Sequence, residues 1–168
     1  MTTVPAPHRR PVGWLIAIGA LGLALLLTLA LLVGLAGTRT AAGRAAYVPA
    51  ATKAARTATL VFLNVSADHV DADLKRMLDL STGKFRAQYQ ARRTQLRSGI
   101  VQNHVQQTGK VLGVAPTQAG STAATVLVAA DATVRNTSTP KGRTVHYRIR
   151  LSLVRPHDRW LVSALNIE

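Results

Sequence analysis

The spacing of hydrophobic and polar positions changes twice along the chain, from one uninterrupted apolar run to helical periodicity and then to alternation. The run extends from Trp14 to Ala36 and contains no charged residue. Its 23 residues would span roughly 34 Å as an α-helix, enough for a hydrocarbon core about 30 Å thick. A core helix would show a polar face, and a signal peptide would have a shorter apolar region. The pattern therefore predicts a retained transmembrane helix over residues 12–37, with Trp14, Leu26 and Leu32 in the bilayer.

The charges that flank this helix do not decide its orientation. Residues 1–11 form a short tail with Arg9 and Arg10, whereas Arg39, Arg44 and further basic residues follow the helix. A count of positive charges near the helix ends places the C-terminal side in the cytoplasm, but a long domain is translocated largely regardless of its charge. Both orientations remain open from the charges alone.

An alanine-rich stretch over residues 38–64 predicts a helical stalk and the first helix of a domain whose α+β part occupies residues 65–168. Alanine has the highest helix propensity of all residues. Pro49 lacks an N–H and restricts Val48, so we expect it to kink or restart the helix. From Ala50 to Leu63 a helix is predicted.

Helical spacing continues after residue 65. Ser66 or Asp68 can cap a new helix, and Asp71 and Asp73 then fall in its first turn, near the positive end of the helix dipole. Gly83 ends this pattern. The apolar positions recur at intervals of three and four and predict one buried stripe: Val70, Leu74, Met77 and Leu78.

A further amphipathic helix is predicted from Lys84 to Ile100. At about 100° per residue, its apolar side chains fall within a roughly 60° arc and predict a buried stripe: Phe85, Tyr89, Leu96 and Ile100. Arg86, Arg93 and Arg97 cluster beside this stripe. They form either a solvated basic flank or a docking ridge for anionic groups, and they are the first candidate interaction surface.

From residue 101 onward the hydrophobic period becomes two, which is typical of strands. Gly109 and Gly113 are expected to mark bulges or turns, and residues 136–142 form a predicted loop with turn chemistry at Pro140 and Gly142. Strands are predicted over residues 101–115, Ala123 to Val134, Val145 to Leu153, and Trp160 to Ile167.

The third of these strands has the clearest alternation. Apolar Val145, Tyr147, Ile149, Leu151 and Leu153 alternate with His146, Arg148, Arg150 and Ser152. The basic face with His146, Arg148 and Arg150 is the second candidate interaction surface. A tight turn at residues 156–158 should pair this strand antiparallel with the last one. Helices followed by strands predict an α+β fold, with helices packed on one face of an antiparallel sheet.

Composition limits the class of partner. Without the first 36 residues, the remaining 132 carry 19 basic and 7 acidic residues, a formal charge of +12. Such a surface favours anionic partners, among them phospholipid head groups and acidic proteins. Aromatic residues, at 4% of the chain, are too few for a stacking platform on single-stranded nucleic acid. The absence of Cys excludes disulfides, thiol catalysis and thiolate metal sites.

The sequence contains no motif for catalysis or metal binding. No two of the five His residues lie three or four positions apart, and there is no nucleophile elbow, phosphate-binding loop or dinucleotide fingerprint. His69, which precedes Asp71 and Asp73, is interpreted as part of a helix start. Asp131, a lone carboxylate within a strand, would act as a base in a curved-sheet pocket, but exposure to solvent or pairing with a nearby arginine is the favoured interpretation. We therefore predict no enzymatic activity, no metal and no cofactor.

The segment from Asp73 to Tyr89 has leucines at turn spacing that lead into Thr82-Gly83-Lys84-Phe85-Arg86, and the chain closes on Trp160 with Val162 and Leu165. Together with a short basic tail, one membrane helix, an alanine-rich helix and four strands, these features resemble the Mce-associated membrane proteins of actinobacterial cell envelopes. The resemblance covers almost the whole chain. Lys84 stands where an acid is common in that family.

The resemblance implies a cystatin-like or NTF2-like domain, with helices cradled by a curved antiparallel sheet and a shape similar to VirB8-type secretion components. It also implies a cytoplasmic N-terminus and a domain outside the cytoplasmic membrane. The expected role is support for the assembly or stability of an Mce-type lipid-import complex, with Mce subunits or other envelope membrane proteins as partners. The alternatives are a VirB8-like scaffold of a secretion machine and a small-lipid-binding domain.

Overall fold

The computed structural model describes residues 46–168. The predicted transmembrane helix over residues 12–37, with Trp14, Leu26 and Leu32, lies outside the described residues. Within residues 46–168, no helix is both long and apolar enough to cross a membrane. The chain forms, in order, a helix over residues 46–63, β1 (Val65–Ser66), η1 (Ala67–His69), α2 (Val70–Asp79), α3 (Gly83–Ala91), α4 (Arg93–Gln102), β2 (Gln106–Ala119), β3 (Ala123–Asn136), β4 (Thr139–Val154), η2 (Pro156–Asp158) and β5 (Leu161–Ile167).

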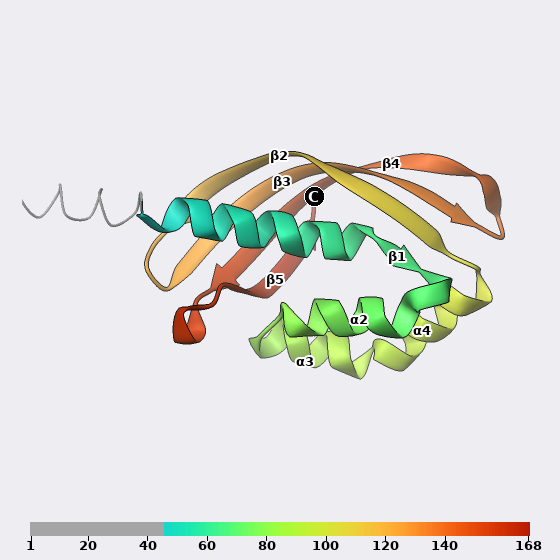
Figure 1. The fold of residues 1–168 in the computed structure, drawn as a ribbon, viewed down its shortest axis with the longest axis horizontal. Helices are drawn as coiled ribbons and strands as arrows, with labels where there is room; N and C mark the ends of the chain where they lie inside the picture. The colour runs from blue at the N-terminus through green and yellow to red at the C-terminus, as the bar shows by residue number, and fades with distance from the viewer. Residues whose placement is uncertain (1–45) are drawn as a thin grey trace, which may run out of the picture. The chain divides into compact units, whose positions relative to one another are not determined.

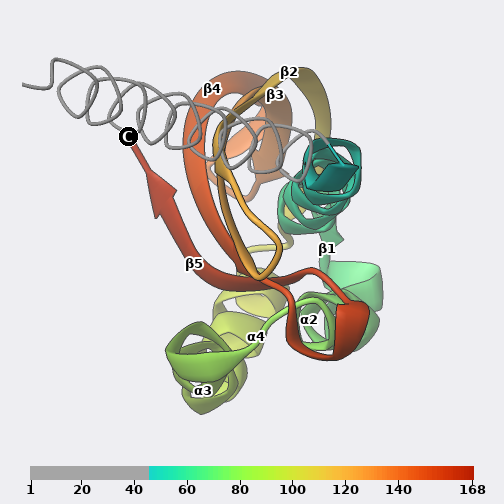
Figure 2. The same cartoon turned by 90° about the vertical axis from the view of Figure 1, so that its left-hand side faces the viewer.

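The strands form one antiparallel sheet in the order β1-β2-β3-β4-β5, so neighbours along the chain are also neighbours in the sheet. The sheet arches along the helix over residues 46–63, and α2, α3 and α4 gather beneath that helix (Figure 1). A view turned by 90° shows how the strands curl around the helix (Figure 2). The predicted α+β class, with helices packed on a curved antiparallel sheet, is confirmed; the two-residue β1 was not predicted.

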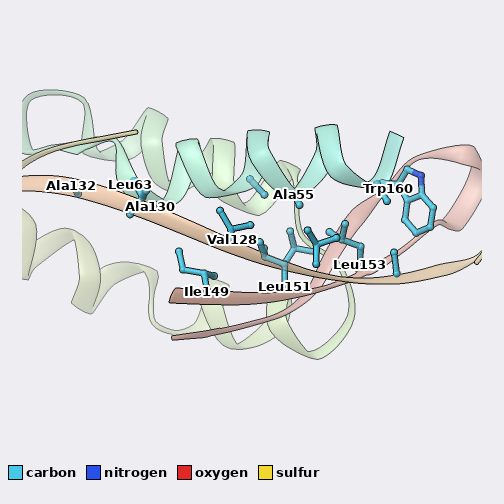
Figure 3. Packing of buried hydrophobic residues seen from close by; sticks show 14 residues of the cluster. Ala55, Leu63, Val128, Ala130, Ala132, Ile149, Leu151, Leu153 and Trp160 are labelled. Atoms are coloured by element: carbon cyan, nitrogen blue, oxygen red, sulfur yellow. The ribbon is translucent and has the colours of Figure 1, made fainter. Parts of the chain in front are cut away.

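The hydrophobic core lies between the helix over residues 46–63 and the inner face of the sheet (Figure 3). Ala51, Ala55 and Ala58 are buried and follow helical spacing, so the helix backbone approaches the strands closely. The larger side chains come from the alternate positions of β3 and β4 and from β5: Val126, Val128, Ile149, Leu151, Leu153 and Val162. Each such side chain contributes about 1.5–3 kcal/mol when it leaves water.

The helix is continuous from residue 46 to residue 63, so it does not restart at Pro49, which was one of the two expected outcomes. A proline inside a helix costs about 3 kcal/mol or more when it breaks a hydrogen bond. Here Ala51 and Ala55, in the turns that follow Pro49, are packed against the sheet with no exposed surface. Packing of these alanines on the sheet therefore stabilises the helix that contains Pro49.

The start of α2 agrees with the sequence pattern. The Ser66 hydroxyl accepts the N–H of Asp68 at 3.1 Å and caps η1, which leads directly into α2. Asp71 and Asp73 lie in the first turn of α2, and the predicted stripe of Val70, Leu74, Met77 and Leu78 is buried. Asp73 is itself buried, and its carboxylate accepts the Ser66 N–H at 2.9 Å and a hydrogen bond from Arg76. This carboxylate thus ties β1 to α2.

The single helix predicted from Lys84 to Ile100 is wrong, because the segment forms α3 and α4 with a break at Arg92. The Arg92 N–H still bonds to the Gln88 carbonyl and the Leu96 N–H to the Arg92 carbonyl, at 3.2 and 2.9 Å. The helix therefore bends without losing these bonds. Neither α3 nor α4 contains a buried residue, and α3 contacts the sheet at β5.

Strand boundaries differ from the prediction at both ends of β2, which ends at Ala119 instead of residue 115, and at the turn between β3 and β4. Residues 101 and 102 belong to α4, and β2 begins at Gln106. The predicted loop over residues 136–142 is reduced to a two-residue turn, so Pro140 and Gly142 lie within β4. The cause is Asn136, whose side-chain oxygen accepts the N–H groups of Ser138 at 3.0 Å and of Thr139 at 2.8 Å and thereby closes the turn.

The two glycines of β2 have different roles. A register shift in the pairing with β3 lies between Val111 and Gly113, so the expected bulge is confirmed there. Gly109 is instead a place of close approach, because a Cβ at this position would lie 2.5 Å from the Leu63 Cβ. The Asn64 side chain bonds to the Gly109 backbone on both sides, accepting its N–H at 3.2 Å and donating to its carbonyl at 3.4 Å. The end of the first helix therefore rests directly on β2.

Candidate functional site

The first candidate surface, Arg86, Arg93 and Arg97, is used within the domain. The Arg86 guanidinium donates to the Leu78 carbonyl at the end of α2. Arg93 and Arg97 both pair with Asp71 in the first turn of α2, at 3.4 and 3.0 Å. A cation at the C-terminal end and a carboxylate at the N-terminal end both suit the dipole of α2. The three arginines therefore link α2 to α3 and α4, and they do not form a row of unpaired cations.

The second candidate surface lies on the outer face of the sheet, opposite the helices. Along β4 the inward positions Ile149, Leu151 and Leu153 are buried, and the outward positions His146, Arg148 and Arg150 are exposed. This confirms the predicted alternation. No helix of the described part of the chain covers this face (Figure 2).

Two of the three basic side chains on this outer face have acidic partners. The His146 Nδ1 lies 2.6 Å from the Asp131 carboxylate, and the Arg150 guanidinium lies 2.6 Å from the Glu168 carboxylate. Of the two expectations for Asp131, its partly exposed position on the outer face fits the first, whereas its partner is a histidine across the strands and not an arginine. Arg148 has no carboxylate partner among residues 46–168, so it is available to an anionic group.

A shallow apolar trough of about 470 Å³ lies beside Arg148 on the sheet. Small residues leave it open on the outer side: Gly113 and Ala115 from β2 and Ala129 from β3, with Leu127 next to them. Leu112, at the bulge of β2, is 57% exposed. Apolar contact area next to an unpaired arginine is typical of the centre of a protein interface.

A second groove, which the sequence analysis missed, lies between the first helix, α3, α4 and β5. Its volume is about 310 Å³, and its walls come from Phe62, Phe85, Tyr89, Leu96 and Leu165, with Arg92 at the same site. The Phe85 and Tyr89 rings lie 6.0 Å apart. Burial, and to a smaller extent the Asp73 carboxylate, raises the pKa of the Tyr89 phenol above its ordinary value. Phe85, Tyr89 and Leu96 were recognised in the sequence as one stripe, but the stripe was expected to be buried.

The candidate groups for catalysis and metal binding lie apart on the surface of the described residues. Within residues 46–168, no cluster of three His, Asp or Glu side chains is arranged to hold a metal ion. His69 is exposed at the start of α2. Asp131 faces the outer side of the sheet, in an open groove of about 300 Å³ with Thr108, Thr133 and Thr144. Asp131 thus lies in an open polar groove, where its carboxylate contacts His146.

Several solved structures share this fold. An IcmL-like type IV secretion system protein from Legionella pneumophila is 10% identical, with a TM-score of 0.58 over 70% of this chain and 88% of that chain. The periplasmic domain of DotI is 10% identical, with a TM-score of 0.59 over 70% and 91%. A periplasmic fragment of TraM is 9% identical, with a TM-score of 0.58 over 71% and 96%. At these identities the similarity establishes the fold alone.

The sequence also matches a protein family. A family model described as "Uncharacterized protein Rv1363c/MT1408-like" matches residues 16–166, which is most of the chain. No curated protein sequence matches this chain.

Proposed function

This chain belongs to the Rv1363c/MT1408-like family, and from its fold and its uncovered sheet face we propose that it is a membrane-anchored, non-catalytic scaffold of a protein machine in the cell envelope. The fold is that of an IcmL-like type IV secretion system protein and of two periplasmic domains. These similarities favour a VirB8-like scaffold of a secretion machine over the Mce accessory role.

The observation that carries the proposal is the outer face of the sheet. It combines an apolar trough with Arg148, which has no carboxylate partner among the described residues. A partner that covers the trough would gain apolar burial, and an acidic group on that partner would pair with Arg148.

The experiment is purification of the full chain from its own membranes in a mild detergent, followed by mass spectrometry. We expect other envelope subunits to be recovered, and we expect Arg148→Glu to lower their recovery roughly tenfold, which corresponds to about 1.4 kcal/mol. Lys53→Glu is the matched control, because Lys53 is also an exposed cation but lies on the first helix. Recovery of no envelope subunit, or equal loss in both variants, would contradict the proposal.

The Mce accessory role is the second candidate, and the sequence resemblance over Asp73 to Tyr89 and at Trp160 favours it. The identity of the recovered subunits separates the two roles, because one requires Mce subunits and the other requires secretion subunits. The small-lipid-binding alternative requires a closed apolar pocket with a polar group such as Asp131 or His146 pointing into it. Both side chains lie on the outer face of the sheet in contact with one another, so this alternative is not part of the proposal.

The anchor and the topology are also part of the proposal: residues 12–37 span the cytoplasmic membrane, residues 1–11 are cytoplasmic and the domain is outside. The chain has no Cys, so single introduced cysteines give an unambiguous test. In intact cells, a membrane-impermeant maleimide should label Ser138→Cys in the exposed β3–β4 turn and should label Thr3→Cys only after permeabilisation. The reverse labelling pattern, or recovery of the chain in the soluble fraction, would overturn this part.

A further inference from the structure

The apolar side of α3 and α4 is only partly covered in the described domain. Neither helix contains a buried residue, and Leu96 and Val101 are 36% and 37% exposed. Phe85 and Tyr89 are half-buried and line the groove of about 310 Å³ together with Phe62 and Leu165. A cavity of roughly 150 Å³ is enough for a benzene ring, so this groove has room for one or two large side chains.

The same two helices are strongly basic. From Gly83 to Gln102 there are five basic residues and no acidic one. Arg93 and Arg97 share the single carboxylate of Asp71. Arg92, which lines the groove, has no carboxylate partner among residues 46–168 and is exposed. The groove is therefore apolar inside and cationic at Arg92.

The acidic side chains of this chain are already engaged. All seven acidic residues of the sequence lie in the described part. Six of them form ion pairs, namely Asp71, Asp73, Asp79, Asp131, Asp158 and Glu168. Asp68 accepts hydrogen bonds from Ser66 and Gln106. A second copy would bring a net positive charge against this groove without an unengaged carboxylate, so self-association at this site is disfavoured.

We propose that this groove binds a segment of another protein in which an apolar anchor side chain is flanked by carboxylates. The proposal rests on the proposed scaffold function and assigns a partner chemistry to a surface separate from Arg148. The anchor fills the space between Phe62, Phe85, Tyr89 and Leu165, and a neighbouring carboxylate pairs with Arg92. Aromatic walls around a buried anchor with an arginine beside it are the usual composition of a binding hot spot.

The experiment is photo-crosslinking of the full chain in its own membranes, with p-benzoylphenylalanine in place of Leu96. The matched control has the same replacement at Leu112, another exposed leucine, on the outer side of the sheet. We expect adducts from position 96 with a protein segment that carries a net negative charge and an apolar residue at the point of attachment. Adding Arg92→Glu should lower the adduct yield roughly tenfold, because like charges then meet, whereas Arg92→Lys should leave it within about twofold. Arg135→Glu, at an exposed cation of β3 that does not line the groove, should also leave the yield within about twofold.

The other outcomes overturn the inference. Adducts from position 96 with lipid would assign the groove to the membrane surface, and adducts with a second copy would assign it to a homodimer. No adduct from position 96, while envelope subunits still co-purify with the chain in an Arg148-dependent manner, would refute the groove and leave the scaffold function intact. Adducts that are unaffected by Arg92→Glu would refute the requirement for an acidic partner. Loss of co-purification altogether would remove the scaffold function as well.

Discussion

The hydroxyl of Thr59 provides a direct test of how the first helix packs on the sheet. Thr59 has no exposed surface, and its Oγ1 has no hydrogen-bond partner within the described residues. Burying a hydroxyl without a partner costs about 1–3 kcal/mol. Valine has nearly the same shape and helix propensity and replaces this hydroxyl by a methyl group. We therefore expect Thr59→Val to raise the free energy of unfolding by about 1–2 kcal/mol, which is about 4–8 °C in Tm for a domain of this size.

The assay is denaturant unfolding of the full chain in detergent, with tryptophan fluorescence as the signal. A Trp14→Phe background leaves Trp160, which lies in the core, as the only reporter. Thr57→Val is the control, because Thr57 is exposed on the same helix and its replacement should change stability by less than about 0.5 kcal/mol. Thr59→Ser keeps the hydroxyl and removes a methyl group, so it should destabilise by about 1 kcal/mol.

The expected order of stability at position 59 is thus Val above Thr above Ser. If Thr59→Val lowers the free energy of unfolding while Thr57→Val does not, the Thr59 hydroxyl must make a hydrogen bond that stabilises the fold. The assignment of an unpartnered hydroxyl in this core would then be wrong.

Three further predictions concern the same domain. Gly109→Ala should destabilise the domain by about 1–3 kcal/mol in the same assay, because its Cβ would lie 2.5 Å from that of Leu63. The control Gly99→Ala, with open space around it in α4, should stabilise by about 0.5–1 kcal/mol, and an unchanged stability of Gly109→Ala would contradict the close approach. Asp73→Asn should lower the free energy of unfolding by about 2–3 kcal/mol, measured by thermal unfolding, because a buried carboxylate that accepts two hydrogen bonds loses its charge. An unchanged Tm would show that the Asp73 carboxylate does not link β1 to α2. The pKa of Tyr89 is raised in the folded state, so the stabilisation from the buried neutral phenol is complete below the ordinary pKa of 10.0 and declines as pH rises through the folded-state pKa. Tyr89→Phe should therefore flatten the dependence of unfolding free energy on pH above pH 10, and an unchanged slope would count against burial of the phenol.

Periodicity was sufficient for most of the fold. Alternation along residues 145–153 predicted which side of β4 is buried, because a strand with one face against a core must alternate. The spacing of Val70, Leu74, Met77 and Leu78 predicted the buried side of α2 for the corresponding reason in a helix. In both cases the side-chain pattern follows directly from the geometry of a single element.

The candidate site could be predicted only in part. Which side of β4 carries His146, Arg148 and Arg150 follows from alternation, so their exposure was predictable. Which of them has a carboxylate partner was not, because Asp131 and Glu168 come from β3 and from the end of the chain and reach β4 only through the register of the sheet. The same reason applies to Arg93 and Arg97, whose partner Asp71 is more than twenty positions away.

By itself, the sequence determined the apolar run over residues 14–36, the division into helices and then strands, and the excess of positive charge, since each depends on composition or on one element. Only the tertiary structure decided that Phe85, Tyr89 and Leu96 line an open groove instead of a buried seam. The physical reason is that a helical pattern states which side chains share a face, whereas the depth of their burial depends on what the rest of the chain places against that face. Here α3 meets the sheet mainly at β5, at the edge of the sheet, so the apolar face of α3 and α4 is left half-covered beside Arg92.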